Sequence, residues 1–312
     1  MNSRRHLIQA AAGLAMAATP LPRRTLGKTG LEVSILGLGG APIGNLPDHA
    51  AAVDVVKACY DAGVNYFDTA SAGAYGLSQT RYGAALARVR DKVVLSTKTR
   101  HRTWTQAELD LTQSLTNMKT DHIDLYQIHN VINEEDIDFI FARRGVMEMV
   151  EKARRDGKIR FVGVTGHTDP AILNKILSRY SFDTILMPLS VTDGANKPKS
   201  FESQTLPVAK KLGMGVIAMK TLGAGAVLRE KAATVREALE YVWTLPVSTA
   251  ILGCSETAHV AGNAEIARNF RPLTAEGMDS LRRRARELPL HAMEPWKRLP
   301  VDGQPAAEYR AD

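Results

Sequence analysis

Three side chains of different chemistry end three consecutive apolar segments of the chain. Asp68, Lys98 and His129 each come directly after such a segment, at intervals of roughly 30 residues. An acid, a cation and an imidazole at equivalent positions can move protons together, although each alone has an ordinary structural explanation. We therefore take the three residues as one candidate site.

Tyr75 lies seven residues after Asp68, on a segment whose Gly73 leaves room for a bulge. A free tyrosine hydroxyl has a pKa near ~10 and is a poor acid at neutral pH unless a nearby cation stabilises the phenolate. Lys98 can be that cation, and Asp68 can keep its ammonium charged and oriented. His129 can then hold the oxygen of a substrate carbonyl beside the Tyr75 hydroxyl. The set predicts proton donation to a carbonyl group.

The elements that carry these residues recur along the chain. Short apolar runs alternate with segments of helical period, and runs such as 93–96 are apolar on both faces, as in a buried parallel sheet. The runs start near Ile35, Val64, Val93, Ile123, Phe161, Thr184, Gly215 and Thr249. Eight strand and helix units predict an α/β fold, a closed (β/α)8 TIM barrel, in which the chemistry lies where the strands end.

A doubly wound nucleotide-binding fold is the competing architecture. It needs Gly-x-Gly-x-x-Gly after the first strand, and the segment Gly37–Pro42 has proline where the last glycine belongs. The barrel is expected over residues 24–288, with an N-terminal β-hairpin at Arg24–Glu32 that closes its floor and an extra C-terminal helix at Thr274–Glu287. Residues 289–312 are expected to form a C-terminal tail.

Composition excludes several classes of protein. Hydrophobic residues make up 45% of the 312 residues and charged residues 23%, values typical of a folded globular chain. Two cysteines are too few for a disulfide framework, a zinc knuckle or an iron–sulfur cluster held by this chain alone, so any redox chemistry must use a bound organic cofactor or another kind of metal site. The net charge is +7, but five of the basic residues lie in the acid-free residues 1–28. No nucleic-acid partner is expected.

The first 20 residues have the pattern of an export signal. Arg4 and Arg5 precede an apolar stretch from Leu7 to Ala18, and the segment resembles a twin-arginine signal. It predicts a periplasmic protein that meets the export machinery, the alternative being a frayed helix on a cytoplasmic protein. The longest small-apolar stretch is about half of the ~20 residues that a membrane helix needs, so no stable membrane insertion is expected.

Asp68-Thr69-Ala70, Tyr75-Gly76-x-Ser78, Lys98 and His129 together resemble the aldo-keto reductase family, from Arg24 to about Asn263. The resemblance implies metal-independent hydride transfer between NAD(P)H and the carbonyl carbon of an aldehyde or ketone, or the reverse reaction on an alcohol or sugar. It implies that Tyr75 is the proton donor, that Lys98 and Asp68 lower its pKa, and that His129 orients the carbonyl.

The resemblance also implies a cofactor site on the later strands. Lys220 and the loop that follows it would meet the pyrophosphate, and the segment from Gly253 to Asn263 would hold the adenosine end. Glu256 repels a 2′-phosphate and can accept hydrogen bonds from ribose hydroxyls, which favours NAD(H) slightly over NADP(H), although His259 could offset this. The implied cofactor residues are Gly40, Thr165, Gly166, Leu186, Met219, Lys220, Leu222, Gly223, Gly253, Ser255, Glu256, His259 and Asn263.

Three features depart from the family pattern. Tyr75 follows Asp68 by seven residues where the family takes five, Leu186 replaces an amide, and Met219 replaces an aromatic residue. The long spacing and the missing amide leave open a regulatory or sensing barrel that binds cofactor without turnover. A Schiff-base aldolase using Lys98 is a further alternative, disfavoured because an ammonium paired with an acid is a poor nucleophile.

Overall fold

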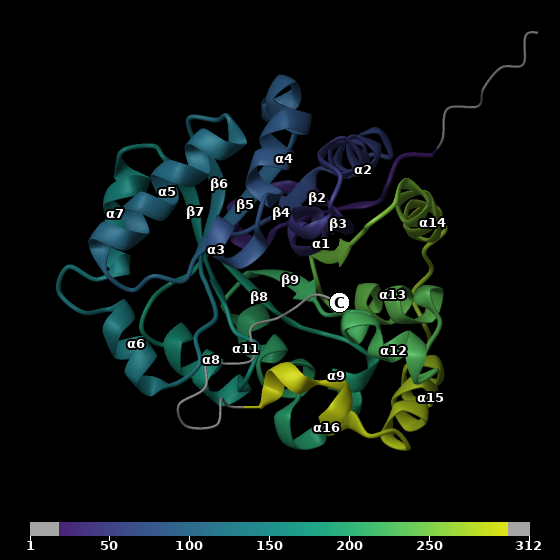
Figure 1. The fold of residues 1–312 in the computed structure, drawn as a ribbon. Helices are drawn as coiled ribbons and strands as arrows, with labels where there is room; N and C mark the ends of the chain where they lie inside the picture. The colour runs from purple at the N-terminus through teal and green to yellow at the C-terminus, as the bar shows by residue number, and fades with distance from the viewer. Residues whose placement is uncertain (1–18, 299–312) are drawn as a thin grey trace, which may run out of the picture.

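The computed structural model describes residues 19–298, in which eight parallel strands close into a barrel surrounded by helices (Figure 1). The ring order is β10-β3-β4-β5-β6-β7-β8-β9. The strands are β3 (Leu36–Gly39), β4 (Tyr66–Asp68), β5 (Val94–Thr99), β6 (Ile123–Ile128), β7 (Ile159–Thr165), β8 (Thr184–Pro188), β9 (Gly215–Met219) and β10 (Thr249–Gly253). Each begins within two residues of a predicted run, so the (β/α)8 barrel is confirmed.

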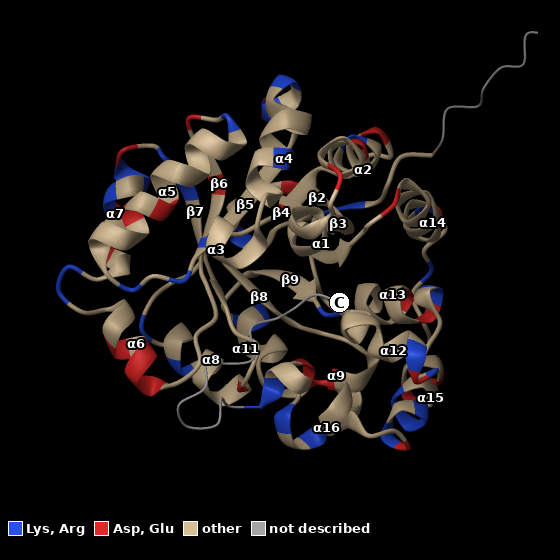
Figure 2. Cartoon of the chain, viewed as in Figure 1, with Lys and Arg blue, Asp and Glu red and all other residues tan. Residues whose placement is uncertain are grey.

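The helices lie outside the strands or on the loops at the barrel ends (Figure 1). They are α1 (Gly40–Asn45), α2 (His49–Asp61), α3 (Ala72–Tyr75), α4 (Ser78–Leu86), α5 (Trp104–Met118), α6 (Glu134–Ile140), α7 (Val146–Arg155), α8 (Pro170–Leu177), α9 (Val191–Ala195), α10 (Phe201–Gln204), α11 (Leu206–Lys211), α12 (Ala226–Arg229), α13 (Val235–Thr244), α14 (Thr257–Arg268), α15 (Ala275–Arg286) and α16 (Leu290–Met293). Figure 2 shows charged residues mainly on these helices and on loops, whereas the strands carry few.

Local sequence signals explain where the helices begin and end. Asp48 caps α2 by accepting a hydrogen bond from the Ala50 nitrogen at 2.7 Å, and Gly63 follows that helix with a φ of +100°. Thr234 and Glu237 form a capping box at the start of α13. These caps fix the lengths of the helices and therefore the positions at which the chain returns to the barrel.

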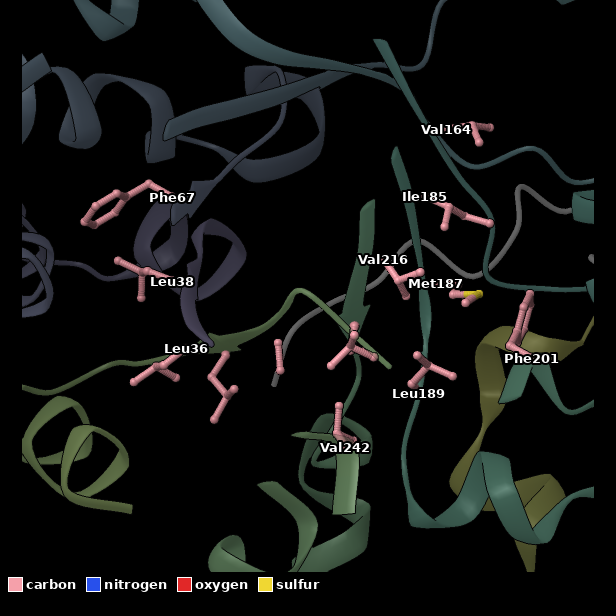
Figure 3. Close-up of a cluster of buried hydrophobic side chains, with 14 of the residues drawn as sticks. Leu36, Leu38, Phe67, Val164, Ile185, Met187, Leu189, Phe201, Val216 and Val242 are labelled. Atoms are coloured by element: carbon pink, nitrogen blue, oxygen red, sulfur yellow. The ribbon is translucent and has the colours of Figure 1, made fainter. Parts of the chain in front are cut away.

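Two apolar clusters hold the barrel together. The larger cluster lies between the strands and the surrounding helices, and Figure 3 shows part of it, including Phe67, Ile185 and Val216. The smaller cluster fills the inside of the barrel and includes Leu186 and Met219. Burial of apolar surface on both faces of the strands supplies most of the driving force for this fold.

The N-terminal hairpin pairs β1 (Arg23–Thr25) with β2 (Glu32–Ser34), as predicted. Leu26, in its turn, is fully buried in the cluster inside the barrel. The Lys28 nitrogen donates to the Gly213 carbonyl at 2.9 Å, just before β9 begins. The hairpin therefore closes the end of the barrel opposite to the one where the strands finish.

The chain after the barrel packs against it as far as the structure describes it. Thr274 caps the predicted extra helix, α15, by accepting from the Gly277 nitrogen at 3.1 Å. Further on, Lys297 is buried and donates to Asp193 at 2.6 Å and contacts Glu294 at 2.9 Å. Residues 289–298 are thus held by buried ion pairs. Residues 299–312 lie outside the described part of the chain.

Most of the predicted export signal also lies outside the described residues, because the description begins at Thr19. Within residues 19–298, none of the helices has both the length and the apolar character needed to cross a bilayer.

We expect Gly27→Ala to lower the free energy of unfolding by about 3 kcal/mol. Gly27 has a φ of +51°, and an added Cβ would overlap the Gly215 nitrogen and lie 2.7 Å from the Gly213 oxygen. Gly30→Ala is the matched control, since Gly30 has a φ of +72° but no atom within 4 Å of the added Cβ. Backbone strain alone should cost it about 1 kcal/mol. If urea unfolding shows that Gly27→Ala and Gly30→Ala lower the free energy of unfolding equally, the close contact between hairpin and barrel is contradicted.

Candidate active site

A cavity of about 400 Å³ opens at the end of the barrel where the strands finish. Residues at the ends of β3, β4, β9 and β10, and residues that follow β5, β6 and β7, contribute to its wall. Of the predicted site residues, the cavity is lined by Gly40, Asp68, Tyr75, His129, Met219, Lys220, Leu222 and Gly253. The structure therefore brings three of the four predicted catalytic residues to one cavity, and the fourth lies directly behind them.

That fourth residue, Lys98, forms a fully buried ion pair with Asp68. Its Nζ also donates to the Thr69 carbonyl at 2.7 Å. The other Asp68 oxygen accepts hydrogen bonds from Ser96 Oγ at 3.3 Å and from Gln127 Nε2 at 3.1 Å. Burial raises the pKa of Asp68, and the Lys98 ammonium and these hydrogen bonds act in the opposite direction. Because Lys98 is held by oxygen acceptors and does not line the cavity, the structure does not favour a Schiff-base role.

The segment between Asp68 and Tyr75, which is two residues longer than in the family pattern, ends in a helical turn. This turn is α3, which ends at Tyr75 and is followed by Gly76 with a φ of +50°. Helix α1 packs closely against this turn, because a Cβ at Gly44 would overlap the Tyr75 carbonyl oxygen. The Leu77 nitrogen donates to the Gly44 carbonyl at 3.3 Å. The longer spacing is thus absorbed locally, and Tyr75 still reaches the cavity.

The Tyr75 ring lies near both the buried cation and the imidazole. Lys98 Nζ is 5.1 Å from the ring centroid, and the His129 ring contacts Tyr75 edge-on with centroids 6.3 Å apart. Burial raises the pKa of Tyr75, and although Lys98 lowers it, Asp68 raises it further. The net direction differs from the lowering expected from the family resemblance. The reason is that removal of water from the phenolate outweighs the attraction of the ammonium.

His129 is a buried, neutral imidazole. Only 3% of the residue is exposed, and within the described chain its Nδ1 has no hydrogen-bond partner. Its backbone is fixed on both sides, since its nitrogen donates to the Thr99 carbonyl at 2.9 Å and its carbonyl accepts from Arg102 at 2.8 Å. Burial and then Lys98 lower the pKa of His129 well below its usual value. At neutral pH the ring can therefore donate a single hydrogen bond without carrying charge.

Several cavity residues were not among the predicted site residues, and three of them lie close together. Arg100, Asn130 and His167 follow β5, β6 and β7 and line the wall beside His129. The His167 ring lies 5.7 Å from the His129 ring, and its backbone nitrogen donates to Asn130 Oδ1 at 3.2 Å. Arg100 and His167 each lie two residues beyond a predicted strand-end residue, Lys98 and Thr165. Extending the strand-end criterion by two residues would have found both.

The cavity wall on the side of β3, β9 and β10 is built from small residues and one cation. A Cβ at Gly40 would overlap Ser78 Oγ, and one at Gly253 would lie 2.5 Å from Pro42 Cγ. Lys220 follows β9, and burial together with Lys98 lowers its pKa to about 7. Its Nζ lies 5.8 Å from the Trp296 ring centroid. Glycine backbone beside an amine fits the close approach of a phosphate-bearing ligand.

The other predicted cofactor residues do not line this cavity. Thr165 Oγ1 accepts from the Asn130 nitrogen at 2.9 Å, and Leu186 is buried in the cluster inside the barrel. Ser255, Glu256 and His259 follow Gly253, on the turn before α14 and at the start of that helix, and all three are exposed. His259 Nδ1 lies 3.4 Å from Ser255 Oγ. The predicted residues outside the cavity lining are Thr165, Gly166, Leu186, Gly223, Ser255, Glu256, His259 and Asn263.

Residues 35–238 match the model of the aldo/keto reductase family. The chain is 30% identical to 6-dehydroglucose reductase of Novosphingobium aromaticivorans over 298 residues, 80% of this chain and 92% of that protein. It is 29% identical to L-galactose dehydrogenase of Arabidopsis thaliana over 66% of this chain and 67% of that protein. An aldo-keto reductase from Klebsiella pneumoniae in complex with NADPH has the same fold, with a TM-score of 0.70 and 22% identity over 85% of this chain and 95% of that one.

The chain therefore belongs to the aldo/keto reductase family. It is an NAD(P)-dependent oxidoreductase of that family, acting on carbonyl or hydroxyl groups.

We expect the buried neutral state of His129 to appear in the pH dependence of stability. The unfolded imidazole takes up a proton near pH 6.5, whereas the folded one does not until a much lower pH, so stability is lost as the pH falls. Between pH 7 and pH 5, the free energy of unfolding of His129→Asn should therefore fall by about 2 kcal/mol less than that of the wild-type protein. His49→Asn, at an exposed position on α2, is the control. Urea unfolding with the same pH slope in all three proteins would contradict a neutral buried His129.

Proposed function

We propose that this chain reduces a small carbonyl compound, or runs the reverse reaction, with Tyr75 as the general acid and base. The observation that carries the proposal is the buried Asp68–Lys98 pair under the Tyr75 ring, with neutral His129 beside it. The glycine backbone and Lys220 on the opposite wall support binding of the phosphates of a dinucleotide there. When bound, the nicotinamide supplies or accepts the hydride.

The protein's own residues handle the proton. The raised pKa of Tyr75 keeps its phenol protonated at neutral pH, so the proton is available when negative charge develops on the carbonyl oxygen. Lys98 then stabilises the phenolate that remains, and Asp68 holds Lys98 in place. His129 donates a hydrogen bond to the same carbonyl oxygen and so orients the substrate. In the oxidative direction the phenolate takes the proton from a hydroxyl group.

A polar, sugar-like substrate is supported by two relatives. The names of 6-dehydroglucose reductase and L-galactose dehydrogenase say that those proteins act on sugars. The polar side chains Asn45, Asn130 and His167 line the cavity and can bind hydroxyl groups. For the cofactor we propose a preference for NAD(H), because the exposed carboxylate of Glu256 would repel a 2′-phosphate. The ratio of kcat/KM with NADH and NADPH tests this preference, and a ratio in favour of NADPH contradicts it.

We expect Tyr75→Phe to reduce kcat by about 100- to 10,000-fold while leaving cofactor affinity nearly unchanged, because only the proton donor is lost. The measurement is nicotinamide absorbance at steady state with a panel of aldehydes, ketones and sugars, with affinity from fluorescence titration. Tyr60→Phe, on α2 away from the cavity, is the matched control.

Full turnover by Tyr75→Phe would contradict the assigned role. Cofactor binding by the wild-type protein without turnover of any substrate would instead favour the sensing barrel. That barrel is the second candidate function, because Leu186 is buried in the apolar cluster and provides no amide to the cofactor.

We also propose that the protein is exported through the twin-arginine pathway to the periplasm. Support comes from Arg4-Arg5 and the apolar stretch that follows them. Fractionation of expressing cells, with the intact mass of the purified protein, tests it. A full-length cytoplasmic product that is unaffected by Arg4→Lys with Arg5→Lys would contradict export.

A further inference from the structure

Gln127 is a buried amide directly behind the Asp68–Lys98 pair. It lies on β6, in register with Lys98 of β5 and two residues before His129. Its Nε2 donates to Asp68 Oδ1 at 3.1 Å and to Ser96 Oγ at 2.7 Å. The side chain is fully buried and does not line the cavity. Gln127 can therefore act on the site through Asp68, and not by contact with a ligand.

Gln127, Ser96 and Asp68 form a closed triangle of hydrogen bonds. Ser96 Oγ accepts from Gln127 and donates to the same Asp68 oxygen at 3.3 Å. Oδ1 of Asp68 thus accepts two hydrogen bonds, whereas Oδ2 pairs with Lys98. Burial raises the pKa of Asp68, and after Lys98 the hydrogen bonds from Ser96 and Gln127 oppose this rise. The triangle therefore leaves one oxygen to the ammonium and supports the ionised carboxylate.

The orientation of the Gln127 amide follows from its neighbours. A carboxylate only accepts hydrogen bonds, so the amide nitrogen, and not the amide oxygen, faces Asp68. The amide oxygen is buried, and among residues 19–298 it has no donor. A buried acceptor without a donor lowers stability, and an apolar side chain of the same length would avoid that loss. The hydrogens that the amide donates therefore account for its presence better than a gain in stability does.

Gly163 of β7 gives this amide its room. It is in register with Gln127, and a Cβ at position 163 would lie 3.0 Å from Gln127 Cγ and 2.5 Å from Thr184 Oγ1. Contacts this short would displace the side chains on both neighbouring strands. The barrel wall thus accommodates the glutamine in its present position because position 163 has no side chain.

We propose that Gln127 is a positioning residue for the proton transfer at Tyr75. Directly and through Ser96, its amide fixes the Asp68 carboxylate, so that the Lys98 ammonium stays beneath the phenol. Without the amide the carboxylate can rotate or take up a proton, and the cation is then held less well. Because Gln127 does not line the cavity, its loss should lower kcat and spare ligand binding. This inference rests on the proposed function.

The test compares two buried glutamines. Gln127→Met should lower kcat by about 10- to 100-fold, because hydrogen bonds to a carboxylate are lost, while KM and cofactor affinity stay within about twofold. Gln79→Met is the matched control and should leave kcat unchanged. Gln79 is also buried and donates two hydrogen bonds, to Thr97 Oγ1 at 2.9 Å and to Ser114 Oγ at 2.7 Å, away from Asp68. Steady-state nicotinamide absorbance gives kcat and KM, and fluorescence titration gives cofactor affinity.

Two further measurements separate positioning from a general loss of structure. In an Asp68→Asn background, Gln127→Met should change kcat by less than about twofold, because the carboxylate on which the amide acts is gone. Ser96→Ala removes a single hydroxyl and should lower kcat by about 3- to 10-fold. Ser114→Ala is its matched control, since Ser114 accepts from Gln79 at the same 2.7 Å. If Gln127→Met does not fold, this pair of serine variants decides the question.

An unchanged kcat in Gln127→Met or in Ser96→Ala would overturn the inference. So would an equal fall in kcat in each variant and its control, or a full further loss when Gln127→Met is added to Asp68→Asn. In each of these cases the proposed function stands as long as Tyr75→Phe abolishes turnover. Absence of turnover by the wild-type protein on every carbonyl compound tried would overturn the proposed function, and the inference with it.

Discussion

The buried ion pair of Asp68 and Lys98 is the interaction on which the rest of the site depends. Neither side chain is exposed, so each charge has lost the water that would stabilise it and relies on the other. Ser96, Gln127 and the Thr69 carbonyl satisfy the remaining hydrogen-bonding groups. Removal of one partner would leave a buried charge without compensation, at a cost of about 3–5 kcal/mol. The pair therefore fixes the cation in one place beneath Tyr75.

The barrel makes this pair possible because adjacent parallel strands end side by side. Asp68 ends β4 and pairs in register with Ser96 of β5, two residues before Lys98. The next strand along, β6, leads into His129. Tyr75 comes from a loop, and its position depends on the close packing of α1 at Gly44. Rigid strands thus hold the charged groups, and a short helical turn brings the phenol to them.

The sequence predicts the barrel and the strand-end residues because both follow from period and spacing, which are local properties. It does not predict the net pKa shift of Tyr75, which depends on how much water the folded chain excludes. Likewise, the sequence alone does not show that Leu186 points into the barrel core while Arg100 and His167 reach the cavity. Those outcomes depend on loop geometry and on which face of a strand a residue occupies.

The acidity of residue 75 shows most directly whether the buried ion pair acts on the phenol. A fluorinated tyrosine, whose phenol is more acidic than that of tyrosine, is placed at position 75 and titrated by its ¹⁹F chemical shift. The titration is repeated in the double variant Asp68→Asn with Lys98→Met, which removes both charges together. Because Lys98 acts on Tyr75 more strongly than Asp68 does, the phenol should titrate at a lower pH with the ion pair intact. An equal or higher titration pH with the ion pair intact would contradict the account.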